Sequence, residues 1–369
     1  MLGTSKFMRH YSRFLSMQPF FALAMKMNFP PKTTRWFGKS TELVPGMVVR
    51  RILPQIQCRS IGPFVFLDHF GPIPITVGGG NQGMMNVGPH PHIGLCTLTF
   101  LYQGGVLHRD STGVEQPILP DQVNWMCSGK GVTHSERPLL SSLASTTTTT
   151  ATKELHGLQL WVALPKDYED IDPSFHHSSS IVSVERPIVT LGVVLTKLIV
   201  GKFMGYEQTR IPLVPGMEDM FLVSVDFKDE NAEWQCPPLR VDKKKGEEDD
   251  DDDWQVGIYV TSGIATLVNH DQPEDSSSLS VGEIMVLQAG SSSSMTIRGT
   301  NDCKLILLGG SAYPEKRHLL WNFCSWDTNK LKDAADAWDR LDRNKFPPVF
   351  NESNDDSIPI PIPQRHKKT

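Results

Sequence analysis

The sequence contains no long uninterrupted apolar run, which argues against a helix that spans a membrane. It also lacks an excess of basic residues, because the formal net charge of the 369 residues is −5. No overall field therefore draws the protein to nucleic acid. We expect no membrane insertion and no direct nucleic-acid binding.

Cysteine is scarce, and no C-x-x-C pair occurs. A chain of this length can bury a sizeable core without a disulfide framework. We therefore expect free thiols in a reducing compartment. The six cysteines are Cys58, Cys96, Cys127, Cys236, Cys303 and Cys324.

Acidic residues are absent from residues 1–41, which carry seven Lys or Arg side chains among Phe, Met and Leu. A basic, acid-free start is typical of an organelle transit peptide, which would direct the protein to a mitochondrion or plastid. One alternative is a secretory signal, because Ala22-Leu23-Ala24 has the form of a cleavage site. Another is a disordered leader on a protein of the cytoplasm or nucleus. We assign residues 1–43 to this leader.

Turn-forming residues recur from about Val44 at intervals of about 8–9 residues, the spacing typical of an all-β sandwich or barrel. Short β-rich runs such as Cys96–Tyr102 and Leu158–Leu164 lie between the turns. No alternation of strands with helices appears, which argues against a doubly wound parallel sheet. The pattern predicts an all-β chain.

Two polar segments interrupt this pattern and predict surface loops. Ser141–Thr152 contains five consecutive threonines, and Lys243–Asp253 joins three lysines to a run of acidic residues. We expect four parts after the leader. They are an N-terminal β domain at 44–166, a linker at 167–187, a second β domain at 188–312 and a C-terminal helix with an extended tail at 313–369.

One amphipathic helix is predicted near the C-terminus. Its apolar face consists of Leu331, Ala334, Trp338 and Leu341, and Asp327 or Thr328 can cap its start. A wide apolar face must pack on another element, and a wall of one β domain is the expected partner.

The histidines of the first β domain form the strongest chemical signal. In His90-Pro91-His92 two imidazoles lie two residues apart, so they share one face of an extended strand. His134-Ser135-Glu136 places an imidazole and a carboxylate in the same way. Two such strands side by side would offer four ligands to one metal ion.

Three neutral imidazoles and one carboxylate suit Fe(II), Mn, Cu or Zn better than Mg or Ca. On six-coordinate iron this set would leave two positions open for water, oxygen or substrate. His69, His108 and His156 lack a paired ligand, so we expect them in the core or around the site.

Several motifs resemble the pirin family, whose members are bicupins of the cupin superfamily. The resemblance covers roughly residues 44–363 and is most specific up to Pro165. It rests on Phe66-Leu67-Asp68-His69-Phe70-Gly71-Pro72, Pro89-His90-Pro91-His92-Ile93-Gly94, His108-Arg109-Asp110-Ser111, Asp121-Gln122-Val123-Asn124-Trp125-Met126, Gly129-Lys130-Gly131-Val132-Thr133-His134-Ser135-Glu136, His156-Gly157-Leu158-Gln159-Leu160-Trp161 and Trp321-Asn322-Phe323.

The resemblance implies two stacked cupin β-barrels, with iron in the N-terminal one and the C-terminal helix packed on a barrel. It places the metal ligands at His90, His92, His134 and Glu136, and in a dioxygenase we expect Glu136 to be a candidate catalytic base as well. It further implies a C-terminal barrel without metal, and His270 is the only histidine between residues 181 and 316.

Two family-typical residues are replaced here. Where the family commonly reads His-Arg-Gly-Phe-Glu, this chain reads His92-Ile93-Gly94-Leu95-Cys96. We expect Ile93 and Cys96 to change the surroundings of the metal and the polarity of the substrate pocket. Cys96 could be a redox-sensitive thiol, although a small buried apolar residue is the simpler interpretation.

Three functions fit these observations. The first is a quercetin-type flavonol 2,3-dioxygenase that uses a small aromatic substrate and O2. The second is an iron-dependent, redox-sensing transcriptional cofactor that acts through a protein partner. The third is a metal-stabilised barrel without catalysis, which only a turnover measurement would separate from the others.

Overall fold

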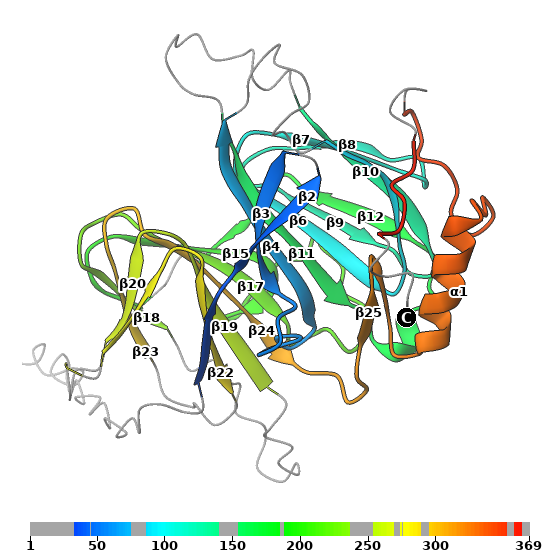
Figure 1. The fold of residues 1–369 in the computed structure, drawn as a ribbon. Helices are drawn as coiled ribbons and strands as arrows, with labels where there is room; N and C mark the ends of the chain where they lie inside the picture. The colour runs from blue at the N-terminus through cyan, green and yellow to red at the C-terminus, as the bar shows by residue number, and fades with distance from the viewer. Residues whose placement is uncertain are drawn as a thin grey trace, which may run out of the picture.

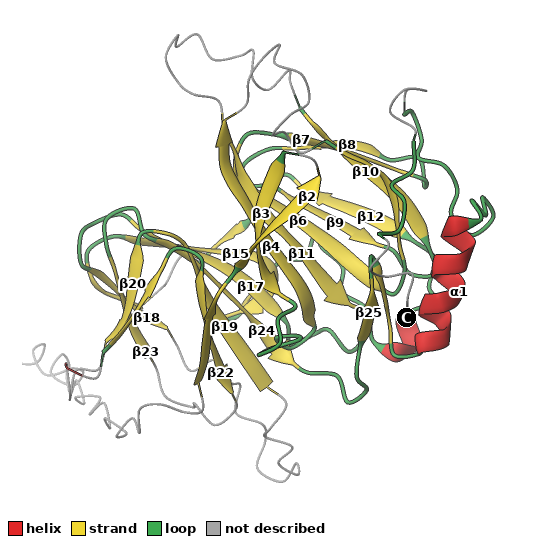
Figure 2. Cartoon of the chain, viewed as in Figure 1, coloured by secondary structure: helices red, strands yellow, loops and turns green. Residues whose placement is uncertain are grey.

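The chain folds mainly into β-strands, as the turn spacing predicts (Figures 1 and 2). The structure is a computed structural model and describes residues 33–44, 46–74, 86–139, 154–184, 188–236, 254–268, 274, 276–288, 295–352 and 358–363. Most of the leader and the two predicted polar loops lie outside these residues. Within the described part, no helix is long and apolar enough to cross a membrane.

The first domain is a pair of antiparallel sheets that face each other. The larger has the strand order β12-β9-β6-β11-β4-β3-β2, and the smaller has the order β5-β10-β7-β8. Their strands are β2 (Lys39–Val44), β3 (Met47–Leu53), β4 (Phe64–Pro74), β5 (Val87–His92), β6 (Leu95–Gln103), β7 (Val106–Asp110), β8 (Glu115–Ile118), β9 (Val123–Cys127), β10 (Val132–Pro138), β11 (Glu154–Ala163) and β12 (Ser174–Ser178). A 3₁₀ turn, η2 (Lys166–Tyr168), follows β11.

The second domain repeats this plan. Its larger sheet has the order β1-β22-β19-β24-β17-β15-β13, with β16 paired to β15, and its smaller sheet has the order β14-β18-β23-β20-β21. The strands are β1 (Thr33–Phe37), β13 (Val182–Ser183), β14 (Ile188–Leu191), β15 (Val194–Phe203), β16 (Tyr206–Glu207), β17 (Phe221–Phe227), β18 (Ala232–Cys236), β19 (Trp254–Ser262), β20 (Ile264–Val268), β21 (Ser277–Ser280), β22 (Glu283–Gln288), β23 (Met295–Gly299) and β24 (Lys304–Ser311).

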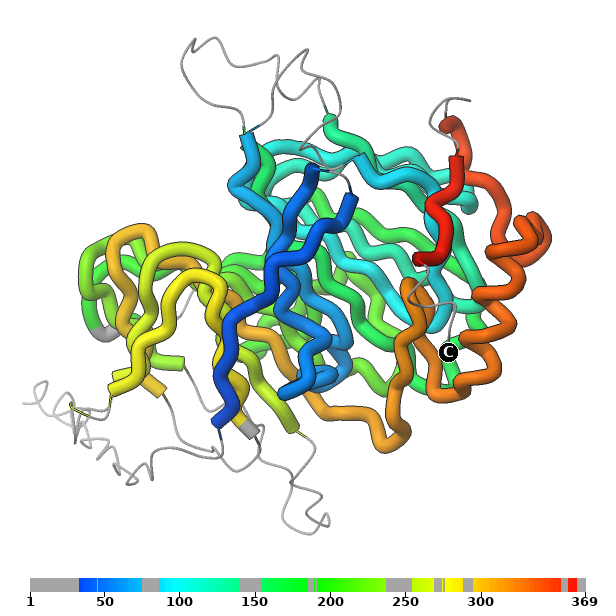
Figure 3. Tube along the Cα trace, in the orientation of Figure 1, coloured from blue at the N-terminus to red at the C-terminus, as the bar shows by residue number. Residues whose placement is uncertain are grey.

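The N-terminal segment connects the two domains, which corrects the predicted leader boundary at residue 43. β1 pairs with β22 of the second domain, and the next strand, β2, pairs with β3 of the first. The dark blue segment in Figure 3 follows this path. Trp36 is buried and donates a hydrogen bond from Nε1 to the Ile52 carbonyl (3.0 Å). Folded structure is therefore present from Thr33, and Arg35 of this basic segment forms an ion pair with Glu283 of β22 (2.6 Å).

A single apolar core joins the two larger sheets. It includes Leu98, Trp125 and Leu160 from the first domain and Leu222 and Ile306 from the second. The two β domains are thus packed back to back through their larger sheets. The opposite face of the first domain's larger sheet looks toward the smaller sheet that carries the paired histidines.

The predicted helix is α1 (Thr328–Asp339), and the Asp327 side chain caps it by accepting from the Asn329 amide. It follows the hairpin of β25 (His318–Leu320) and β26 (Phe323–Ser325) and lies beside the first domain (Figure 1). Leu331 and Trp338 pack with Ile93 and Phe346. Leu341 was expected on the same face, but it lies beyond the helix end with a positive φ of 55° and is exposed.

Candidate metal centre

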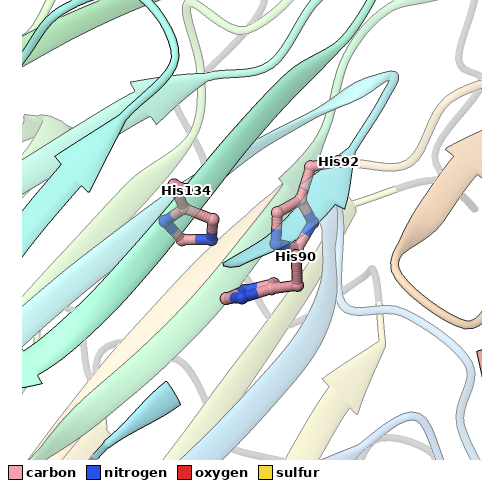
Figure 4. Close-up of side chains that lie close together, drawn as sticks. All are labelled: His90, His92 and His134. Carbon is pink, nitrogen blue, oxygen red and sulfur yellow. The ribbon is translucent and has the colours of Figure 1, made fainter. Parts of the chain in front are cut away.

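The paired histidines of the sequence lie on neighbouring strands of the smaller sheet. β5 carries His90 and His92, and β10 runs antiparallel to it with His134 directly opposite His90. The alternation of side chains along a strand puts both β5 imidazoles on one face. Figure 4 shows the three imidazoles pointing toward one another from these two strands.

The three imidazoles form a compact, buried group. One nitrogen of each lies within 4.8 Å of one nitrogen of the others. The ring of His134 is centred 4.2 Å from that of His90 and 4.9 Å from that of His92. Burial lowers the pKa of all three, to about 4 for His90, so each ring is neutral near pH 7.

The hydrogen bonds of these rings leave their Nε2 atoms for a ligand. His90 donates from Nδ1 to the Gly88 carbonyl (2.8 Å), and His92 donates from Nδ1 to the Asn322 carbonyl (3.0 Å). Backbone acceptors of this kind fix the tautomer of metal-binding histidines. His134 Nε2 is buried and has no hydrogen-bond partner in the described part of the chain. A cluster of neutral imidazoles with an unsatisfied nitrogen fits a transition-metal ion.

Glu136 is the fourth predicted ligand, and the structure does not place it with the other three. β10 pairs regularly with β7 from His134 to Glu136, so both side chains leave the same face of the strand, but the Glu136 carboxylate is not part of the group within 4.8 Å. The side chain is nevertheless buried, and this burial raises its pKa to about 7. The structure therefore assembles three of the four candidate residues and keeps the fourth as a buried carboxyl on the same strand.

The unpaired histidines have two different settings. His108 lies beside the site, with its ring centred 5.2 Å from that of His134 and Nε2 3.1 Å from Asp110 Oδ2. His69 and His156 instead lie where the two domains meet. His69 Nδ1 is 2.6 Å from the Tyr259 hydroxyl of the second domain, and its Nε2 is 2.7 Å from His156 Nε2.

Neither replaced family residue faces the imidazoles, contrary to our expectation of an altered pocket. Ile93 is buried with Phe323 and the residues of α1. Cys96 belongs to the core between the two domains and lies opposite Cys127 on β9. Ile93 lies just after β5, where it forms an isolated bridge with Phe323, and Cys96 leaves β6 on the face away from the metal group because side chains alternate along a strand. The interpretation of Cys96 as a small buried residue agrees with its 1% exposure.

Aromatic rings complete the site, and spacing in the sequence did not indicate them. The Trp161 ring is centred 5.0 Å from that of His92 and stacks on Phe66 at 3.9 Å. Phe175 stacks on His108 at 4.6 Å. The Asn322 contact was also missed, because a backbone carbonyl leaves no side-chain signal.

Gly94 controls the turn that follows His92, and we expect Gly94→Ala to destabilise the domain by several kcal/mol. Its φ is +68°, and a Cβ there would lie 2.0 Å from the Cys324 carbonyl oxygen. Urea unfolding would measure the loss. Gly113→Ala is the control, because that glycine also has a positive φ but no atom within 4 Å of the added Cβ. Equal losses in both variants would refute the steric explanation.

Comparisons with known proteins agree on one family. The family model described as Pirin matches residues 46–162, and the model described as Pirin C-terminal cupin domain matches residues 240–345. A pirin-like protein of Caulobacter vibrioides is 32% identical over 85% of this chain and 94% of its own length. A candidate quercetin 2,3-dioxygenase of Pseudomonas aeruginosa is 30% identical over 83% of each chain.

The fold has a close counterpart among solved structures. The crystal structure of quercetin 2,3-dioxygenase from Acinetobacter baumannii superposes with a TM-score of 0.71 at 26% identity, covering 90% of this chain and 95% of that one. Two cupin-like β domains with one C-terminal helix are therefore the architecture of this chain.

Proposed function

Because this chain belongs to the pirin family, we propose that it is a metal-dependent dioxygenase that acts on a flavonol-like aromatic substrate with O2. The observation that carries the proposal is the buried group of three imidazoles, one of which has an Nε2 without a partner in the part of the chain that the structure describes. Trp161 packs against His92 of this group and Phe175 stacks on the neighbouring His108, and both rings supply a surface for a flat substrate. The relatives named as quercetin 2,3-dioxygenases support this substrate class.

The Nε2 atoms of His90, His92 and His134 would hold the metal, with the Glu136 carboxylate as the proposed fourth ligand. Iron(II) is the proposed ion, and Mn, Cu or Zn also suit this donor set. When bound, the ion would polarise a phenolic oxygen and, in the case of iron, exchange electrons with O2.

The protein residues would position the substrate and handle its proton. Trp161 and Phe175 would lie against the flat rings, and the burial of the histidines would keep bulk water away. Glu136 is the candidate base for the flavonol 3-hydroxyl, because it is the buried carboxyl two residues from His134. A hydroxyl proton would move to a Glu136 oxygen and leave a substrate oxyanion.

Oxygen uptake together with loss of flavonol absorbance tests the proposal. Metal-free protein would be loaded separately with iron(II), manganese, copper and zinc. We expect turnover with at least one of these ions and its loss in His90→Ala. His318→Ala, in the β25–β26 hairpin, is the matched control and should keep wild-type turnover. Equal rates in iron-loaded wild type and His90→Ala would refute a catalytic metal group.

A further inference from the structure

The inner face of the first domain's larger sheet carries two transverse rows of side chains. The first, the aromatic row, joins residues that are direct partners on five neighbouring strands: Phe66, Trp161, Thr97, Met126 and Phe175. The second, the polar row, lies two residues along each strand: Asp68, Gln159, Thr99, Asn124 and His177. Directly paired residues and residues two apart share a face, so both rows point the same way.

Contacts of the aromatic row identify the face as the one that looks toward the histidines. At one end Trp161 packs against His92, and at the other Phe175 packs against His108. The polar row lies about 7 Å further along the strands, because two residues of an extended strand span about that length. This is roughly the length of one aromatic ring with an oxygen substituent.

The polar row is ordered by its own hydrogen bonds. His177 Nδ1 is 2.7 Å from Asn124 Oδ1, which fixes the Asn124 amide with its oxygen toward β12. Thr99 donates from its hydroxyl to Gln159 Oε1 (2.8 Å), which leaves the Nε2 hydrogens of Gln159 as donors. Both amides therefore present NH2 groups, while their oxygens are engaged within the row.

Asn124 is the residue whose pairing is incomplete. Asn124 is only 3% exposed, and its Nδ2 has no hydrogen-bond partner among the described residues. A buried amide donor without an acceptor costs about 1–3 kcal/mol. Packing of the sheet does not require an amide here, because an apolar side chain would fill the same position on β9. We therefore expect the Asn124 amide to donate to a ligand acceptor on the inner face of the sheet.

We propose that the polar row binds the oxygen substituents of an aromatic ligand at the end remote from the histidines. Asn124 Nδ2 and Gln159 Nε2 donate to phenolic or carbonyl oxygens, while the aromatic row holds the rings between them and the metal group. The identity of that ligand as a flavonol rests on the proposed function. Ligands with a second oxygenated ring are thereby selected over those without one.

Two flavonols separate this role from general binding. Quercetin carries hydroxyl groups on its outer rings, and 3-hydroxyflavone has the same skeleton without them. We expect Asn124→Leu to weaken quercetin binding about 5–10-fold, as the loss of one hydrogen bond to a neutral acceptor predicts, and to leave 3-hydroxyflavone within about twofold. Binding would be measured by quenching of tryptophan fluorescence in metal-free protein and, independently, as KM in the metal-loaded protein.

Further variants keep the test decisive if Asn124→Leu folds poorly. Asn124→Asp retains the acceptor for His177 but removes the Nδ2 donor, and Gln159→Leu removes the second amide. Both should weaken quercetin selectively. Thr196→Val in β15 is the control, because it also removes a buried, unpartnered polar atom but lies in the second domain. It should change neither affinity.

The outcomes distinguish this inference from the proposed function. If the Asn124 and Gln159 variants oxidise flavonols and still prefer quercetin as wild type does, the polar row does not bind the ligand, and the proposed dioxygenase activity is unaffected. Equal weakening of both flavonols also overturns ligand binding by the polar row. If the variants lose quercetin binding selectively but the wild-type protein oxidises no flavonol, ligand binding by the polar row is supported and the proposed dioxygenase activity is refuted. If Asn124 Nδ2 donates only to an ordered water, the preference for quercetin over 3-hydroxyflavone would be the same in the variants as in wild type.

Discussion

His134→Ala abolishes metal binding and lowers any metal-dependent turnover by at least about 100-fold, which is the largest effect we expect of a single substitution. The His134 ring is centred 4.2 Å from that of His90 and 4.9 Å from that of His92, and its buried Nε2 has no hydrogen-bond partner among the described residues. Without it, only His90 and His92 of the imidazole group remain, with Glu136 as the proposed third ligand, and this reduced donor set holds a divalent ion far more weakly than the full set.

Metal content per chain and thermal unfolding with and without metal measure this effect. A metal at about 100 times its dissociation constant stabilises the folded state by about 2.7 kcal/mol, so wild type should unfold several degrees higher when loaded. We expect His134→Ala to lose this increase. His318→Ala should keep it. A variant that retains one ion per chain and a normal increase would show that the imidazole group is not the metal centre.

The histidine group was predictable because its information is local. An extended strand sets residues i and i+2 on one face, so His90-Pro91-His92 defines two ligands before any fold is known. The same rule puts His134 and Glu136 on one face of β10, which pairs regularly with β7 across both residues. Glu136 lies outside the compact imidazole group, and the residue pattern alone does not give such a distance.

The partners of the site were not predictable because they come from distant chain segments. The acceptor for His92 is the Asn322 carbonyl, 230 residues later, and a backbone carbonyl of the β25–β26 hairpin has no side-chain signal that would mark it as an acceptor. Similarly, Phe175 reaches His108 from β12, within the segment that we assigned to a linker. Tertiary packing decides such contacts, and one sequence contains no record of them.

The fold was predictable in class and less so in its boundaries. Regular turn spacing is a local property of the chain, and it indicated all-β domains. Which domain an N-terminal strand joins depends instead on pairing with residues far away in the sequence. Thr33–Phe37 has the basic composition of the leader but completes the larger sheet of the second domain, because β22 offers it an unpaired edge.

Stability should fall steeply on acidification below about pH 6.5, because His69 and His156 are buried as neutral rings between the domains. Burial is the main cause that lowers the pKa of His69 to about 3, with contributions from His156 and Arg50. Burial also lowers the pKa of His156 to about 4, with a smaller effect of Lys304. In the unfolded chain both titrate near pH 6.5.

The direction of this pH dependence is set by the number of protons that the folded and unfolded states bind. Between about pH 6.5 and 4 the unfolded state binds protons at His69 and His156 that the folded state does not, so the free energy of unfolding decreases as pH falls. Each histidine contributes up to about 1.4 kcal/mol per pH unit in this window. Above pH 6.5 neither state binds these protons, and the contribution is constant.

A double variant, His69→Gln with His156→Gln, isolates this contribution. Urea unfolding of metal-free protein at several pH values between 7 and 4.5 should give a wild-type slope that exceeds the variant's by up to about 2.7 kcal/mol per pH unit. Tyr259→Phe is the matched control. It removes the hydroxyl at 2.6 Å from His69 Nδ1 but leaves both imidazoles, so it should lower stability at pH 7 and keep the wild-type slope. Parallel pH curves for wild type and the double variant would show that acid acts on other groups.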